Sequence, residues 1–224
     1  MSRLESGDRL SFLARLGGGL VEPAPVNHAH PLPGPLPGGV PPVVSTQLDG
    51  ADPVGSFCRS AEALGCTIQR VGDQAGVPGA LEAVVRRHEC RTAVVSEQPE
   101  ALAAAAALRH LGLATQAASK EACAAADLGL AFADAAIATT GSVIQRSDTI
   151  GGRTVSLLPP VFCCVVPVGR IVPTLAEALA SLTADSMPSN VVIVTGPSRS
   201  GDIENIIVRG VHGPVAVELI VVES

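Results

Sequence analysis

The feature that most constrains the fold is a regular alternation of short apolar runs and helical segments, which begins near Val43. The runs CTIQRV, RTAVVS and LATQ are separated by the segments VPGALEAVVRRHE and EQPEALAAAAALRHLG. Short runs rich in β-branched residues that alternate with helical segments are typical of β-α-β units, which build parallel sheets. The alternation therefore predicts an α/β fold in which a mainly parallel sheet is flanked by helices.

Helix boundary signals support this interpretation. The stretch DPVGSFCRSAEALG predicts a helix that is capped by Asp52, has Pro53 at its first position and is followed by Gly65. The segments SKEACAAAD and TLAEALASLTAD predict two further helices, the second of them after Pro173. The stretch DIENIIVRG is interpreted as a short helix near the end of the chain.

The second half of the chain also contains strand signals. The stretch LGLAFADAAIATTGSVIQRSD contains two strand-like runs interrupted by Gly141, and RTVSLLPPVFCCVVPVGRIV predicts a strand, a Pro-Pro turn and a nearly all-apolar strand. An apolar strand of this kind is buried on both faces. Cys163 and Cys164 are adjacent in it, so we expect their side chains on opposite faces. VVIVT predicts a buried strand and VAVELIVVE the last one.

The chain is expected to have three parts. Residues 1–19 predict a short helical segment, because their apolar residues recur at roughly helical spacing. Residues 20–42 contain eight prolines, which exclude a helix or a central strand and predict an irregular arm. Residues 43–224 are expected to form the α/β domain, and a chain of 224 residues that is 47% apolar can bury one sizeable core.

Composition disfavours several classes of function. A net charge of −6 with only 15 basic residues disfavours a phosphate-backbone partner, and 2% aromatic residues offer no platform for stacked bases, so nucleic-acid binding is not expected. The alanine-rich run Ala101–Leu108 is much shorter than the ~20 residues of a spanning helix. The N-terminus lacks an uninterrupted apolar h-region, so we expect a cytoplasmic protein without a membrane span.

The cysteine and glycine patterns give no cofactor signal. The six cysteines form no C-x-x-C pair, His28 and His30 have no acidic or cysteine companion, and no G-x-G-x-x-G follows a strand. Free cysteine behaves as a small hydrophobic residue, so we expect buried, reduced thiols. The prediction is that this chain holds no metal, no iron–sulfur cluster and no bound dinucleotide.

Polar residues and glycines gather in VVIVTGPSRSGDIENIIVRGVHGP, residues 191–214. Read as strand, loop and helix, this stretch offers an anion the N–H groups of a helix start and the guanidinium of Arg199. An ordinary turn with Ser200 or Asp202 as a helix cap is the alternative. His212, between two glycines, is either a proton carrier or part of a structural turn. The Lys and the spacing of a phosphate-binding Walker loop are absent.

The stretch ATTGSVI places Thr140 next to Gly141 and is interpreted as a second polar backbone cradle, with a hydroxyl nucleophile as the weaker alternative. If this stretch and the Arg199 loop each follow a buried parallel strand, both open on the same edge of the sheet. We therefore expect Arg199, Asp202 and His212 to converge there with the backbone around Gly141.

In this order, the segments ATTGSVI, RTVSLLPP, GRIVPTLAEAL, TGPSRSGDIE and GVHGP resemble the LUD-domain family of lactate-utilisation proteins. The resemblance covers the chain from about Ala125 to the C-terminus, and the region from Val43 only in layout. It implies a fold related to sugar-phosphate isomerase and coenzyme A transferase-like α/β domains. It also implies an accessory role in oxidising L-lactate to pyruvate with iron–sulfur partner subunits.

The family's signature positions give the candidate site. Candidate catalytic residues are Asp202, Glu204 and His212; candidate ligand-binding residues, for a small anionic metabolite, are Thr140, Gly141, Gly196, Ser198, Arg199 and Gly213. Two departures are Ser200-Gly201, where members often have Thr-Ala, and Phe162-Cys163, where some carry a His.

The resemblance supplies no mechanism, and whether the chain is itself an enzyme stays open. One alternative is a stand-alone enzyme or binding protein for an anion such as a sugar phosphate or a thioester, with Glu204 or Asp202 as the base. A protein without any ligand site is the other alternative.

Overall fold

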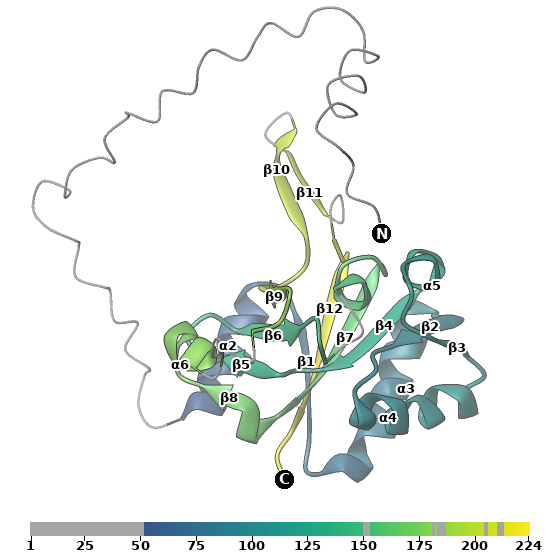
Figure 1. The fold of residues 1–224 in the computed structure, drawn as a ribbon, viewed down its shortest axis with the longest axis horizontal. Helices are drawn as coiled ribbons and strands as arrows, with labels where there is room; N and C mark the ends of the chain where they lie inside the picture. Colours follow the sequence, from purple (N-terminus) through teal and green to yellow (C-terminus); the bar gives the residue numbers. More distant parts are fainter. Residues whose placement is uncertain (1–51, 150–152, 181, 183–186, 204–205, 210–212) are drawn as a thin grey trace, which may run out of the picture. The chain divides into compact units, whose positions relative to one another are not determined.

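The structure is a computed structural model that describes residues 52–149, 153–180, 182, 187–203, 206–209 and 213–224, all within one compact unit (Figure 1). The predicted N-terminal helical segment and the proline-rich arm with His28 and His30 lie outside the described residues. Glu204 and His212 also lie outside them.

The central element is a six-stranded sheet in which every neighbouring pair of strands is parallel. Its strands, in spatial order, are β1 (Thr67–Val71), β12 (Ala216–Val222), β7 (Val161–Pro167), β4 (Leu128–Phe132), β2 (Thr92–Val95) and β3 (Ala114–Ala117). The prediction of a mainly parallel sheet flanked by helices is confirmed. The last strand of the chain, β12, lies inside the sheet between β1 and β7 (Figure 1).

The described helices are α2 (Pro53–Ala63), α3 (Val77–His88), α4 (Pro99–His110), α5 (Lys120–Ala125) and α6 (Leu175–Ala180). The predicted start of α2 is confirmed, because the Asp52 side chain accepts a hydrogen bond from the Gly55 N–H at 2.8 Å. Gly65 follows that helix with φ of +92°. The strand predicted at the start of RTVSLLPP is wrong, since Thr154–Ser156 forms a 3-10 turn that closes before the Pro-Pro pair.

Both faces of the six-stranded sheet are covered. On β7, Cys163 and Val165 pack in a cluster with buried residues of α3 and α4, whereas Phe162 and Cys164 pack in a second cluster with residues of α2. Cys163 and Cys164 therefore face opposite sides, as predicted. All six cysteines are buried and free. Burial raises the pKa values of the Cys163 and Cys164 thiols well above that of an ordinary cysteine, so both thiols stay protonated.

A second, four-stranded sheet has the order β8 (Ile171–Val172), β5 (Ala135–Ile137), β6 (Ser142–Arg146) and β9 (Val191–Val194). In this sheet β6 is antiparallel to both β5 and β9. The expectation that VVIVT is a buried strand is wrong, because β9 lies at an edge and only Val194 of its four residues is buried. An apolar run identifies a strand but does not say whether a neighbour covers it.

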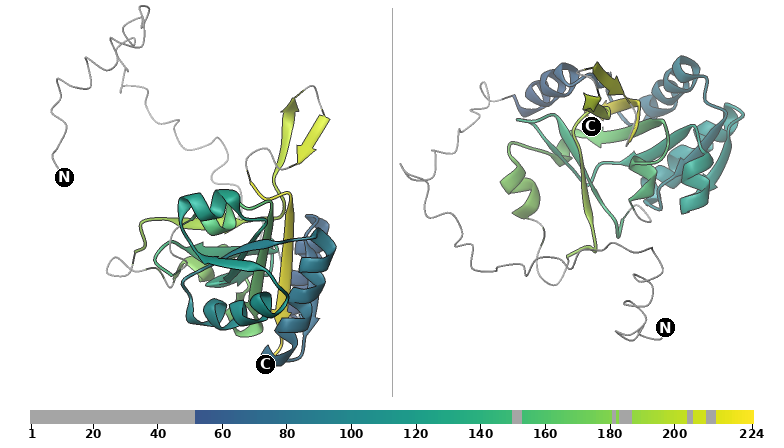
Figure 2. Two further views of the ribbon diagram at one scale, coloured as in Figure 1. Left: turned by 90° about the vertical axis from the view of Figure 1, so that its right-hand side faces the viewer. Right: turned by 90° about the horizontal axis from the view of Figure 1, so that it is seen from above.

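The stretch predicted as a short helix after Arg199 instead forms two strands, β10 (Arg199–Ile203) and β11 (Ile206–Arg209). They pair antiparallel as a hairpin, which Figure 2 shows as a separate two-stranded ribbon in yellow-green. The correction has a local cause: Ile203, Ile206, Ile207 and Val208 are β-branched, and their restricted χ1 angles favour a strand over a helix.

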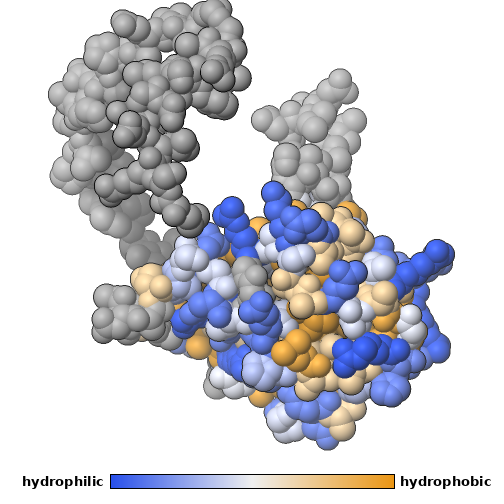
Figure 3. All heavy atoms as spheres, turned by 45° about the vertical axis from the view of Figure 1, so that its right-hand side comes forward, coloured by the Kyte–Doolittle hydropathy of each residue, from blue (hydrophilic) through white to orange (hydrophobic). Residues whose placement is uncertain are grey.

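Large apolar side chains are exposed only at scattered positions among the described residues, namely Leu102, Leu158, Leu175, Leu179, Met187, Ile193 and Val215. In the view of Figure 3, apolar residues are interspersed with hydrophilic ones. Within the described part of the chain, no helix is long and apolar enough to cross a membrane.

Candidate functional site

Two of the motifs meet at one end of the four-stranded sheet. The turn with Thr140 and Gly141 joins β5 to β6, and the loop with Gly196 follows β9. Because β6 and β9 are antiparallel, the start of β6 lies beside the end of β9, where Val143 pairs with Val194. The structure therefore brings the ATTGSVI and TGPSR stretches together.

Hydroxyl groups connect these two loops. Thr140 Oγ1 and Ser142 Oγ are 2.8 Å apart, and Ser142 Oγ and Thr195 Oγ1 are 2.9 Å apart. Nearby, the Ser198 N–H donates a hydrogen bond to the Pro214 carbonyl at 2.8 Å, which holds Ser198 next to Gly213. We call the following residues the loop cluster: Thr140, Gly141, Ser142, Thr195, Gly196 and Ser198.

The two glycines of the loop cluster have a packing role. Gly141 has φ of +63°, and a Cβ atom there would lie 2.2 Å from the backbone nitrogen of Ala61 in α2. Gly196 has φ of +80°, and its Cβ would lie 3.0 Å from that of Leu64. A side chain at Gly141 would force the turn away from α2. Close packing against this helix is thus sufficient to explain why both positions are glycine.

The charged candidates are placed differently from the expectation. Asp202 lies within β10, so it does not cap a helix, and the anion site expected at a helix start there is not formed. The expected meeting of two parallel strand ends is also wrong, because Gly141 and Gly196 lie in loops of antiparallel strands. Arg199 starts β10, directly after Ser198 of the loop cluster. Its role in ligand binding stays a prediction.

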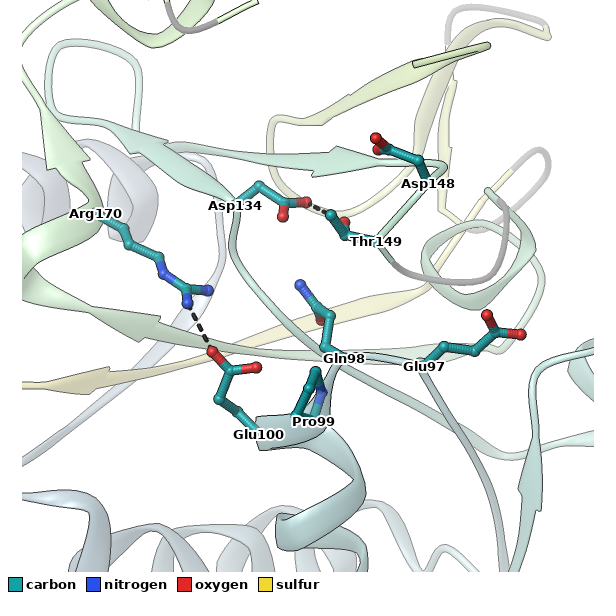
Figure 4. A pocket seen from close by; sticks show the side chains of 8 residues that line it. All are labelled: Glu97, Gln98, Pro99, Glu100, Asp134, Asp148, Thr149 and Arg170. Carbon is teal, nitrogen blue, oxygen red and sulfur yellow. Dashed lines mark hydrogen bonds and ion pairs between the residues drawn. The ribbon is translucent and has the colours of Figure 1, made fainter. Parts of the chain in front are cut away.

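A cavity of about 550 Å³ lies elsewhere, at the carboxyl ends of the six-stranded sheet. Its lining follows strand ends: Glu97 and Gln98 come after β2, Asp134 after β4 and Arg170 after β7. Figure 4 shows these side chains around a common space. We call this space the carboxyl-edge cavity, which is lined by Glu97, Gln98, Pro99, Glu100, Asp134, Asp148, Thr149 and Arg170.

The order of the strands explains why a cavity forms there. After β2 the chain passes through α4 to β3 on one side, whereas β4 lies on the other side of β2 and leads into the second sheet. Connections that leave two neighbouring strands in opposite directions open a crevice above their carboxyl ends, where ligands of open α/β sheets bind. The carboxyl-edge cavity occupies such a crevice between β2 and β4.

Asp134 lies partly buried at this cavity. Its Oδ2 atom accepts hydrogen bonds from the Arg146 N–H at 2.7 Å and from the Thr149 hydroxyl at 2.9 Å. Burial raises the pKa of Asp134, and it outweighs these hydrogen bonds and the charges of Arg170 and Arg146, which act in the opposite direction. The site thus holds a carboxyl group that is protonated more readily than an ordinary aspartate.

Arg170 joins two other parts of the cavity wall. Its Nη1 donates to the Ala133 carbonyl at the end of β4, and its Nη2 donates to Glu100 Oε1, each at 2.8 Å. The backbone N–H of Glu100, and then Arg170, lower the pKa of Glu100. Gln98 is fixed as well, because its side chain accepts from the Phe132 N–H and donates to the Phe132 carbonyl, each at 2.8 Å. These bonds hold the wall in one geometry.

Sequence reasoning missed the carboxyl-edge cavity. Asp134 and Arg170 are far apart in the chain: Arg170 lies in the GRIVPTLAEAL segment but was not a candidate site residue, and Asp134 is a single polar residue soon after an apolar strand. The available signal was their position, because polar residues that follow buried parallel strands collect at one edge of a sheet. Strand order was needed to show which of these residues are neighbours.

Another charged cluster lies near the amino ends of the strands. Glu218 of β12 is only 1% exposed and is held by Arg87 Nη1 at 2.6 Å and His88 Nε2 at 2.7 Å, both from the end of α3. These bonds pair both carboxylate oxygens, and none of the three residues lines the carboxyl-edge cavity. Within the described part of the chain, no three His, Cys, Asp or Glu residues are grouped so that they could hold a metal ion.

Comparison with known proteins identifies the family. The LUD domain model matches residues 56–222, which is most of the chain. The chain belongs to the LUD domain family. Two similar proteins are lactate utilization protein C of Oceanobacillus iheyensis, 41% identical over 103 residues, and lactate utilization protein C 1 of Bacillus mycoides, 42% identical over 105 residues. The first match spans 44% of this chain and 44% of the relative, and the second 45% of each, less than half the length of these relatives.

A solved structure supports the fold. A DUF162 family protein from Deinococcus radiodurans superimposes with a TM-score of 0.58 at 23% sequence identity, covering 76% of this chain and 96% of that one. At this identity the likeness concerns the fold alone. Together with the family match, it confirms the resemblance and the α/β architecture that the motifs indicated.

Proposed function

We propose that this LUD domain protein takes part in lactate utilisation, as an accessory subunit that supports the oxidation of L-lactate to pyruvate by iron–sulfur partner proteins. The observation that carries the proposal is its identity of about 40% to proteins named lactate utilization protein C. In this scheme the partners supply the redox group that accepts electrons from lactate. This chain contributes a ligand site and a docking surface.

The proposed ligand of the loop cluster is a small anionic metabolite. Support comes from the row of hydroxyl groups of Thr140, Ser142 and Thr195 and from the proximity of Ser198 to Gly213. Hydroxyl and backbone N–H groups are donors for carboxylate oxygens, and Arg199 follows Ser198 directly in the chain. Asp202, Glu204 and His212 are the candidates for proton transfer in this hypothesis.

Growth on lactate tests the role. In cells that lack the native gene, we expect the wild-type chain to restore growth on L-lactate, and Arg199→Lys and His212→Gln to restore it poorly. Lys cannot reproduce the planar two-pronged grip of Arg on a carboxylate. Growth on glucose and circular dichroism of the purified variants are the controls. Normal growth of the deletion strain on L-lactate would refute the role. Full rescue by both folded variants would refute only the loop-cluster site.

Purification from native cells tests the partners. We expect iron and lactate-oxidising activity to co-elute with the tagged chain at low salt, and to separate from it when the complex is dissociated. The chain itself should then show no iron–sulfur absorbance. Stoichiometric iron and sulfide in the isolated chain would contradict the assignment of the redox centres to partner proteins.

A further inference from the structure

Two groups at the carboxyl-edge cavity attract an anion: the guanidinium of Arg170 and the N-terminal turn of α4. The carboxylate of Glu100 interacts with both. Glu100 accepts a hydrogen bond from Arg170 Nη2, and it lies in the first turn of α4, where backbone N–H groups face an anion. Its lowered pKa reflects both interactions. Because Glu100 already serves as the anion for Arg170 and for this helix start, a negatively charged ligand would have to displace it.

The remaining charges of the cavity are negative. Beyond the Glu100–Arg170 pair, its lining contains the carboxyl groups of Glu97, Asp134 and Asp148 and no further Lys or Arg. Arg146, outside this lining, pairs with Asp148 at 2.8 Å, and this ion pair lowers the pKa of Asp148. A cleft lined by one sign of charge concentrates ligands of the opposite sign. With Glu100 paired to Arg170 and Asp148 paired to Arg146, the carboxyl groups of Glu97 and Asp134 are left outside these ion pairs, so the cavity favours a cation over a phosphate group.

Asp134 gives the cavity a specific partner for such a cation. Its carboxylate is oriented by the Arg146 N–H and the Thr149 hydroxyl, so its position is fixed before a ligand arrives. The nearby guanidinium groups do not offset the cost of its burial. A ligand cation beside Asp134 would supply the missing compensation, since an opposite charge at hydrogen-bond distance favours the ionised carboxylate.

We propose that the carboxyl-edge cavity binds a small organic cation that carries an amine group, with Asp134 as the main acceptor of its N–H groups and with Glu97 as a further carboxylate. A volume of about 550 Å³ is of the size that holds a small metabolite. This inference goes beyond the role in lactate utilisation and is independent of the anion site at the loop cluster.

Titration calorimetry on the full-length protein tests the proposal, with 1,4-diaminobutane as the probe and ribose 5-phosphate and MgCl2 as comparison ligands. We expect saturable binding of one diamine per chain, with at least tenfold weaker affinity in Asp134→Asn. The matched control is Glu62→Gln, which removes an exposed carboxylate of α2 outside the cavity lining and should leave the affinity unchanged. Glu97→Gln, an exposed position that should not affect folding, is expected to weaken binding about two- to threefold.

The affinity should also depend on pH and salt. It should increase as the pH rises through the raised pKa of Asp134, because the ionised carboxylate binds the amine. The other charged groups at the site are Glu97, Glu100, Asp148, Arg146 and Arg170. Absence of saturable diamine binding, equal affinity in Asp134→Asn and Glu62→Gln, or tighter binding of ribose 5-phosphate would each overturn the proposal. Saturable Mg²⁺ binding that excludes the diamine would replace the amine site by a metal site.

Discussion

The loop cluster and the carboxyl-edge cavity are both polar, yet the fold produces them in different ways. The loop cluster connects antiparallel strands, its described side chains are uncharged, and its glycines pack against α2. The cavity is charged and concave, and it is assembled from the ends of three parallel strands. The difference shows that a recognisable motif can report close packing, whereas a ligand-sized space can form from residues that no single motif brings together.

The largest expected effect tests the packing role of the loop cluster. Gly141→Ala should reduce the free energy of unfolding by about 2–4 kcal/mol, because the new Cβ combines positive φ with a collision against the backbone of α2. Urea denaturation measures the loss. The matched control is Gly112→Ala, where φ is +85° but no atom lies within 4 Å of the new Cβ, so only about 1 kcal/mol of backbone strain is expected. Equal losses in the two variants would mean that packing against α2 contributes nothing.

An intermediate effect concerns the pH dependence of stability at the cavity. Burial raises the folded-state pKa of Asp134 above its ordinary value of 3.8, so the folded protein binds more protons there than the unfolded chain. The contribution of this carboxyl to stability is present below pH 3.8 and is lost as the pH rises through the raised pKa. Relative to wild type, Asp134→Asn should therefore gain stability across this window, as measured by thermal unfolding between pH 3.5 and 8.

Asp127 serves as a control, because its pKa is shifted in the direction opposite to that of Asp134. It accepts hydrogen bonds from the N–H groups of Arg91 and Thr92, and these lower its pKa below 3.8. Its stabilising contribution is present above pH 3.8 and is lost as the pH falls through the lowered pKa. Asp127→Asn should therefore differ from wild type in the pH dependence of its stability only below about pH 4. The same pH profile for both variants would argue against a distinct environment at the cavity.

The smallest expected effect separates packing from binding in the loop cluster. Thr195→Val removes one hydroxyl of the row at an exposed position, so stability should change by less than about 1 kcal/mol. If the hydroxyls hold an anionic metabolite, the same variant should grow more slowly than wild type on L-lactate while growing normally on glucose. Unchanged growth on both would leave the cluster with a packing role alone.

The parts of the fold that were predictable depend on local signals. Side chains within a few residues of each other determine where α2 and α3 begin and end, and they identify the buried strand β7. The hairpin β10–β11 is not predicted although its signal is also local: a β-branched run favours strands, whereas the stretch was interpreted as a helix that starts at Ser200 or Asp202. Its register was beyond sequence reasoning, because pairing depends on which two segments meet.

The candidate site was predictable only in part, for the same reason. Proximity between Thr140 and the Gly196 loop was expected, but for a wrong cause: β9 pairs antiparallel with β6 in a second sheet. Asp134 and Arg170 were not expected to meet at all. They do so because β4 and β7 are neighbours in the sheet, although 28 residues separate the end of β4 from the start of β7 along the chain.

By itself, the sequence determined the α/β class, most helix positions, the opposite orientations of Cys163 and Cys164, and membership of the LUD domain family. These properties depend on periodicity, capping and short motifs, which are encoded within one or two turns of chain. Only the tertiary structure decided the strand order, the second sheet and the carboxyl-edge cavity. Their physical cause is the pairing of distant strands, which places residues such as Asp134 and Arg170 around one cavity without any pattern that links them in sequence.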